Sequence, residues 1–253
     1  MQFDPDASKA LSFTCNVLGF YSELISAADT HSPDEPSLGG KLLFVGELDD
    51  DGRALVVAGN VAGAASLAAT SDLAAQKNAI HDGVVDFLVT SLDEALRILK
   101  NEIRKHETVA VCIGVAPDSV EREMLERGVL PDIVRPSGIS PAADRGADDA
   151  LIVWSVSSAP ARWLPKLDDI ALECLGSGDE VSRRWLRLAP RYLGRMASGT
   201  HLVKAHRDFA RQFMEKVQRQ ADDGKFGVPV RVCVSHDSGW EEYDFGAIKL
   251  KQP

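Results

Sequence analysis

The alternation of short apolar runs with helical patterns over residues 41–134 restricts the fold of this chain more than any other feature. The runs at 84–89 and 108–113 are almost uninterrupted, and segments with apolar residues at three- and four-residue spacing separate them. Strands that are apolar on both faces are typical of parallel sheets covered by helices on both sides. The sequence therefore predicts an α/β fold with a doubly covered parallel sheet.

Residues 54–70 contain a candidate ligand-binding turn. Ala54 to Val57 predict a buried strand, Gly59 and Gly63 predict a turn, and the Ala-rich residues that follow predict a helix. A strand, a glycine turn and a helix N-terminus often receive anionic ligands in α/β sheets. The glycines lack the full G-x-G-x-x-G pattern of dinucleotide sites, so a plain strand-to-helix turn is the alternative.

The rest of the chain divides around an irregular stretch at 135–149 that is rich in Pro, Gly, Ala and Asp. We expect a helix and linker over 1–38, a cofactor-type domain over 39–145, and a mainly helical segment with some strands over 146–253. His201 and His206 are predicted on a helix, where a five-residue separation places them on different faces and argues against a shared metal ion.

Composition excludes several classes of function. The formal net charge of -10 argues against nucleic acids and anionic membranes as partners. No apolar run approaches the roughly 20 residues that span a bilayer, and the acidic N-terminus is unlike a signal peptide, so a cytoplasmic location is expected. The cysteines lie far apart without metal-ligand spacing, which favours free buried thiols and no metal site: Cys15, Cys112, Cys174 and Cys233.

Several separated segments occur here in an order that resembles one known family. They are Gly52–Gly59 with Gly63–Thr70, His81–Asp86 with Leu92–Leu96, Arg127–Val134, Trp154–Ser157, Asp179–Arg187, and Asp223–Val230 with His236–Gly239. Together they resemble the urocanase (urocanate hydratase) family of histidine degradation. The resemblance implies a Rossmann-like sheet, a hydro-lyase activity that uses NAD as an electrophile on an imidazole substrate, and a homodimer.

The resemblance also implies roles for particular residues. Those expected at the cofactor are Gly59, Asn60, Gly63, Ser66 and Gly114, and those expected near the substrate are His236, Asp237 and Ser238. The chain departs from the family in several respects, including its shorter length, and three of them concern the expected site. Its glycine turn is shorter, Ser238 replaces a thiol, and the acidic residue expected after the next strand is missing because no strand is predicted between the Ala-rich helix and Asn78.

Three hypotheses follow from these observations. The favoured one is a diverged urocanase-like protein with an eroded NAD site, which either binds a small anionic ligand at the helix N-terminus or is non-catalytic. The second is an active urocanate hydratase-like lyase that uses NAD. The third is a structural or partner-binding α/β protein whose site has filled in. Because a fold alone does not carry function, the residues of the site must decide between them.

Overall fold

The structure is a computed structural model that describes residues 5–27, 36–135, 149–197, 199–236 and 239–246. The chain divides into two compact units. A parallel-sheet unit comprises residues 13–143 and 191–196, and an antiparallel-sheet unit comprises residues 1–12, 144–190 and 197–253. The first helix, α1 (Pro5–Ala27), contributes residues to both units.

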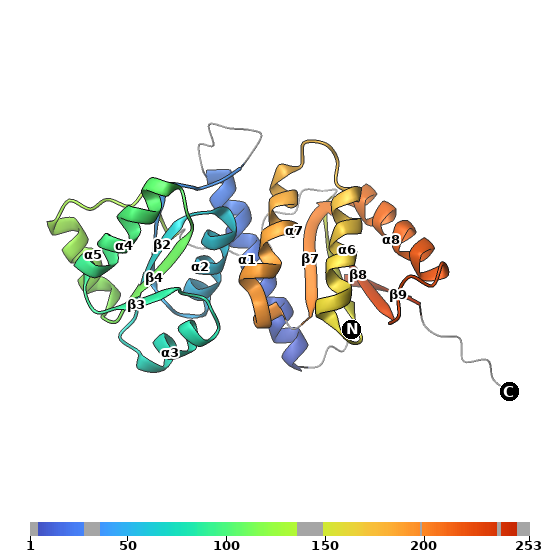
Figure 1. Cartoon of the computed structure of the whole chain (residues 1–253), viewed down its shortest axis with the longest axis horizontal. Coiled ribbons are helices and arrows are strands. Elements are labelled where there is room, and N and C mark those ends of the chain that lie inside the picture. Colours follow the sequence, from blue (N-terminus) through green and yellow to red (C-terminus); the bar gives the residue numbers. More distant parts are fainter. Residues whose placement is uncertain (1–4, 28–35, 136–148, 198, 237–238, 247–253) are drawn as a thin grey trace. The chain divides into compact units, whose positions relative to one another are not determined.

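The parallel-sheet unit has five strands in the order β3-β4-β2-β1-β5, and every neighbouring pair is parallel. The strands are β1 (Leu42–Glu47), β2 (Ala65–Ala69), β3 (Phe87–Val89), β4 (Val109–Ile113) and β5 (Ile133–Val134). The connecting helices are α2 (Asp50–Ala62), α3 (Leu73–His81), α4 (Leu92–Lys105) and α5 (Pro117–Glu126). This Rossmann-like sheet with flanking helices confirms the predicted fold class (Figure 1).

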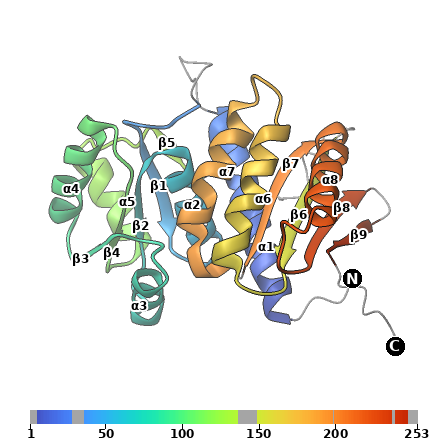
Figure 2. The ribbon, with the colours of Figure 1, turned by 45° about the vertical axis from the view of Figure 1, so that its right-hand side comes forward.

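The strand order determines which helices share a face of the sheet. Crossovers between parallel strands are right-handed, so the steps from β1 to β2 and on to β3 put α2 and α3 on one face. The return steps to β4 and β5 put α4 and α5 on the opposite face (Figure 2). There both helices join one apolar cluster with β1, β2 and β4. The cluster includes Leu67 and Val111 of the strands, and Leu99 and Met124 of the helices.

The predicted strand at Ala54–Val57 is wrong, because these residues lie inside helix α2. Asp49 caps the start of this helix, and Gly63, with φ +95°, ends it. Nearly every residue from Gly52 to Ala62 is buried, so the helix has no polar face to reveal its period. A short apolar run without that period is equally compatible with a strand or a buried helix.

The predicted Ala-rich helix after Gly63 is also wrong. Residues Ala65 to Ala69 form the fully buried strand β2 between β1 and β4. Small side chains let α2 approach this strand closely, since a Cβ added to Gly59 would lie 2.8 Å from the Ser66 Oγ. Close packing on both faces therefore overrides the helix propensity of alanine.

The other predicted elements of this unit occur near their expected positions. The run at 41–45 becomes β1, and the runs at 84–89 and 108–113 become β3 and β4. Ser91 caps α4 by accepting a hydrogen bond from the backbone N–H of Glu94, whose own carboxylate accepts from Thr90. These apolar runs and the capping residues of α4 therefore both predicted their elements correctly.

The antiparallel-sheet unit has four strands in the order β7-β6-β8-β9. They are β6 (Asp149–Val156), β7 (Thr200–His206), β8 (Val230–His236) and β9 (Gly239–Phe245), and each neighbouring pair is antiparallel. Its helices are α6 (Pro160–Cys174), α7 (Glu180–Leu193), whose last residues belong to the other unit, and α8 (Arg207–Asp222). A short 3-10 helix, η1 (Gly194–Ala197), follows α7.

The predicted helix that carries His201 and His206 is wrong, because both residues lie in strand β7. His206 also caps the start of α8. The predicted irregular stretch at 135–149 falls mostly on residues 136–148, outside the described residues. Among the described helices, none is long and apolar enough to cross a membrane. The four cysteines are free thiols, of which all but Cys15 are buried.

Candidate functional site

The carboxyl edge of the parallel sheet is the candidate functional site. Strands β2 and β4 are neighbours, and the helices that follow them, α3 and α5, leave toward opposite faces. Such a switch in direction opens a crevice beyond the strand ends, where open α/β sheets bind their ligands. The chain segments after β1, β2 and β4 therefore decide what this site can hold.

The turns that follow β2 and β4 are joined by polar contacts. The side chain of Gln76, only 6% exposed, donates from Nε2 to the backbone carbonyl of Thr70 at 2.9 Å. The backbone N–H of Thr70 donates in turn to the carbonyl of Ile113 at 3.1 Å. A Cβ on Gly114 would lie 3.4 Å from the Gln76 Nε2, so glycine permits this close approach of the two turns.

The turn between β1 and α2 is filled by the chain itself. The Asp49 carboxylate accepts a hydrogen bond from the backbone N–H of Gly52 at 2.7 Å, which satisfies one of the free donors of the helix start. A Cβ on Gly52 would lie 2.1 Å from the carbonyl oxygen of Glu47. The carbonyl of Glu47 therefore lies directly against the first turn of α2.

The same turn is strongly acidic. Asp50 and Asp51 occupy the first turn of α2 beside the capping Asp49. Arg135, which follows β5, bonds with both of its terminal nitrogens to the Asp49 carboxylate, at 3.1 and 3.4 Å. It also lies 3.6 Å from the Asp51 carboxylate. This guanidinium is thus engaged by two acidic side chains.

An acidic residue does follow the second strand, contrary to the prediction that it is missing. The prediction failed because strand β2 was assigned to a helix, so no strand remained before Asn78. In the structure Asp72 lies three residues beyond Ala69, the end of β2, and its carboxylate caps α3 by accepting from the backbone N–H of Ala74 at 2.7 Å. The carboxylate is therefore engaged in a helix cap.

Four of the five residues predicted at a cofactor lie away from the carboxyl edge. Gly59 packs within α2 against Ser66 in the middle of β2, and Gly63 lies between the end of α2 and the start of β2, at the amino edge of the sheet. Asn60 and Ser66 are buried, and their side-chain oxygens have no hydrogen-bond partner in the described structure. Only Gly114 lies at the carboxyl edge, directly after β4.

Cys112, one residue before the end of β4, is a buried thiol near this edge. Burial raises its pKa to about 11, because the thiolate would lose its solvation. The thiol stays protonated at neutral pH and is not an activated nucleophile. The described residues also contain no group of three or more His, Cys, Asp or Glu side chains that could hold a metal ion.

The residues predicted near a substrate belong to the other unit. His236 is the last residue of β8, and its Nε2 lies 3.2 Å from a carboxylate oxygen of Glu241 in β9. Tyr243 donates a hydrogen bond to the same carboxylate, and this bond, followed by the effect of His236, lowers the pKa of Glu241. Asp237 and Ser238 lie outside the described residues.

A buried polar cluster in the antiparallel-sheet unit was not predicted. The Asp168 carboxylate in α6 accepts from the Trp154 Nε1 at 3.0 Å and lies 2.9 Å from the His201 Nδ1. The three residues come from β6, α6 and β7, which are distant in sequence. Because His201 was assigned to a helix, no sequence pattern placed it beside Asp168. The cluster connects the sheet to its covering helix.

The parallel sheet and its strand order define the class of this protein, a Rossmann-like α/β protein. Residues 16–138 match the family model described as the urocanase Rossmann-like domain. The S-methyl thiourocanate hydratase of Variovorax sp. (strain JCM 16519 / RA8) is 30% identical over 139 residues, which cover 50% of this chain and 25% of that protein. These two matches support the resemblance to the urocanase family over this domain.

Proposed function

We propose that this chain is a diverged urocanase-family protein that does not hold NAD at the first turn of its Rossmann-like domain and is not an NAD-dependent urocanate hydratase. The observation that carries the proposal is the contact between Gly52 and the Glu47 carbonyl. A dinucleotide site needs space at this turn for the pyrophosphate, and free N–H groups at the helix start. Here the Asp49 carboxylate takes the Gly52 N–H, and the Glu47 carbonyl lies against the same residue.

Charge supports the same proposal. A pyrophosphate brings negative charge to the start of α2, where Asp49, Asp50 and Asp51 already carry three carboxylates. The helix dipole favours an anion at this end by about 0.3–1 kcal/mol. Each aspartate opposes a second anion by an amount of similar or larger size. Arg135, the cation in contact with this turn, is already shared by Asp49 and Asp51.

The experiment measures NAD directly in the purified protein. Denaturing extraction followed by mass spectrometry is expected to release far less than one NAD per chain. Added NAD should leave the melting temperature unchanged, whereas a ligand at 100 times its dissociation constant stabilises a protein by about 2.7 kcal/mol. Stoichiometric NAD, or consumption of urocanate monitored by its ultraviolet absorbance, would establish the hydratase alternative instead. The match to the hydratase relative spans a quarter of that protein. The urocanate assay therefore uses the whole chain and not the matched domain alone.

A second candidate function is binding of a small anion at the turn between β4 and α5. This helix start differs from those of α2, α3 and α4, because its capping residue Ala116 offers no side-chain hydrogen bond. Gly114 lets the amide group of Gln76, which donates to the Thr70 carbonyl, pack directly against this turn. These features support an anion site here rather than at the acidic start of α2.

Thermal shift with inorganic phosphate, citrate and urocanate tests this second candidate. An anion at this turn should raise the melting temperature of the native chain, and Ser119→Glu should abolish the increase. Ser119 is an exposed residue in the first turn of α5, where a carboxylate favours the helix but repels a second anion. If no anion or nucleotide shifts the melting temperature, the structural or partner-binding hypothesis is supported.

A further inference from the structure

Strand β3 is an open edge of the parallel sheet. It lies at one end of the strand order and pairs only with β4 among the described strands. The carbonyl of Val89 accepts a hydrogen bond from the backbone N–H of Gly114, which follows β4, at 2.9 Å. Successive residues of a strand direct their backbone groups to opposite sides, so the N–H and C=O of Leu88 point away from β4. Such an edge can pair with another strand.

The edge strand β7 of the other sheet shows how this chain covers an edge. Its Leu202 and Lys204 carbonyls accept hydrogen bonds from helix α7, at 2.7 Å from the Trp185 Nε1 and at 3.5 Å from the Ser182 Oγ. The described residues give the backbone of Leu88 no such side-chain bond. The outward groups of β3 are therefore available to a segment from outside the chain.

The two faces of this edge differ in their surroundings. Cross-strand partners share a face, and Phe87 is paired with Val111, which belongs to the apolar cluster shared with α4. Phe87 therefore lies on the α4 face, and it is 47% exposed. Leu88 lies on the opposite face and is 41% exposed. A strand that pairs here covers an aromatic ring on one face and a leucine on the other.

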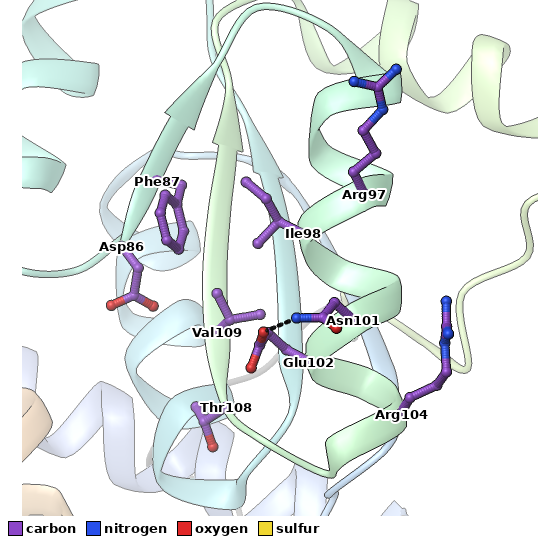
Figure 3. A pocket seen from close by; sticks show the side chains of 9 residues that line it. All are labelled: Asp86, Phe87, Arg97, Ile98, Asn101, Glu102, Arg104, Thr108 and Val109. Atoms are coloured by element: carbon purple, nitrogen blue, oxygen red, sulfur yellow. Dashed lines mark hydrogen bonds between the residues drawn. The ribbon is translucent and has the colours of Figure 1, made fainter.

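An open groove of about 820 Å³ lies on the α4 face of this edge. Figure 3 shows Phe87 and Asp86 on one side of the groove, and Ile98 and Asn101 of α4 on the other. Small-molecule sites usually enclose most of the ligand surface. An open groove beside a strand edge instead fits a segment that lies along the edge.

The acidic side chains of the groove are engaged by the protein itself. The Asp86 carboxylate accepts a hydrogen bond from the backbone N–H of Ala110 at 2.8 Å. The Glu102 carboxylate accepts from the Lys105 ammonium at 2.9 Å and from the Asn101 side-chain amide at 2.7 Å. Both negative charges of the groove therefore already have partners.

The basic side chains of the groove have no comparable partners. Arg97 and Arg104 are exposed and form no ion pair in the described part of the chain. They are seven residues apart on α4, which corresponds to about 10.5 Å along the helix axis. Residues on one face of a strand recur about every 7 Å, so two or three carboxylates on one face of an added strand span both guanidinium groups. This pair of cations favours an acidic partner.

We propose that the β3 edge and the α4 groove bind an acidic, extended segment of a partner protein, which adds a strand antiparallel to β3. One residue of the segment lies opposite Leu88 and exchanges both backbone hydrogen bonds with it. Alternate residues then meet two environments, because apolar side chains pack on Leu88 and acidic side chains reach Arg97 and Arg104. Since β3 is only three residues long, the arginines must supply much of the affinity.

A labelled peptide of five Val-Glu repeats is the probe, because its extended form presents all valines on one face and all glutamates on the other. Its fluorescence anisotropy should rise and saturate when the full chain is titrated at low ionic strength, where charge pairs are least screened. A Val-Lys peptide of equal length should bind at least about tenfold more weakly, because its ammonium groups face the arginines. N-methylation of the valines should weaken binding similarly, because it removes the N–H that faces the Leu88 carbonyl.

Charge reversals in the groove test the assigned residues. Arg97→Glu and Arg104→Glu should each weaken binding of the Val-Glu peptide by at least about tenfold. Arg122→Glu is the matched control, because it reverses the same charge at an exposed position on α5, outside the groove. This control should bind the peptide as tightly as the native chain does. Circular dichroism checks the fold of each variant.

Three results would overturn the proposal. One is an anisotropy that does not saturate with the Val-Glu peptide up to a chain concentration of about 1 mM. The second is an affinity that both groove reversals leave at the level of the Arg122→Glu control. The third is equal binding of the peptide with N-methylated valines, which would show that the segment does not pair with β3 as an antiparallel strand. The peptide comparisons use the native chain, so they decide the matter even where a variant fails to fold.

Discussion

At the scale of single residues, Gly52 has a structural role that its neighbours impose. Its position leaves no room for a methyl group, because a Cβ would lie 2.1 Å from a backbone carbonyl that cannot move without displacing the end of β1. We expect Gly52→Ala to lower the free energy of unfolding by about 1–3 kcal/mol or more through overpacking. Gly176→Ala, where nothing lies within 4 Å, is the control in the same chemical denaturation experiment. Equal stability of both variants would contradict the contact.

The buried cysteines give a prediction that depends on pH. Burial raises the pKa of Cys112 and of Cys233 from 9.0 to about 11. The folded state therefore holds these protons more tightly than the unfolded state, so the associated stability is intact below pH 9 and is lost as the pH rises toward 11.

At pH 8, a thiol reagent should modify the partly exposed Cys15 quickly, and should modify Cys112 and Cys233 only after unfolding. Rapid modification of all cysteines in the native protein would refute this.

At the scale of elements, the Trp154–Asp168–His201 cluster connects β6, α6 and β7. Asp168→Ala would leave the Trp154 Nε1 and the His201 Nδ1 buried without their acceptor. Leaving a buried donor without its acceptor typically costs about 1–3 kcal/mol, and we expect a loss in this range. Asp168→Asn keeps an oxygen for Trp154, so thermal unfolding should show a smaller loss. An alanine variant as stable as the native chain would show that the cluster does not hold α6.

The helices and strands differ in how well they could be predicted from the sequence. Helices α4 and α5 were predictable because each has one polar face and a recognisable start, at Ser91 and Pro117. Helix α2 and strand β2 were interchanged because both are buried on every side, so neither shows a period. Because of that interchange, the binding turn was expected at Gly59–Ser66. In the structure the first turn of the Rossmann-like domain lies at Glu47–Gly52. The parallel sheet survived the error, because strands and helices still alternate.

At the scale of the whole molecule, each unit has its own sheet and its own core, and such units can unfold separately. All four tryptophans lie in the antiparallel-sheet unit: Trp154, Trp163, Trp185 and Trp240. Tryptophan fluorescence therefore reports on that unit, whereas far-ultraviolet circular dichroism reports on both.

The two probes can separate the units. We expect Gly52→Ala to lower the denaturation midpoint seen by circular dichroism and to leave the fluorescence midpoint unchanged, because Gly52 belongs to the parallel-sheet unit. Asp168→Ala should do the reverse and shift the fluorescence midpoint. Units that unfold independently should also give the native chain non-coincident transitions with the two probes. If either variant shifts both midpoints equally, the units unfold as one cooperative structure.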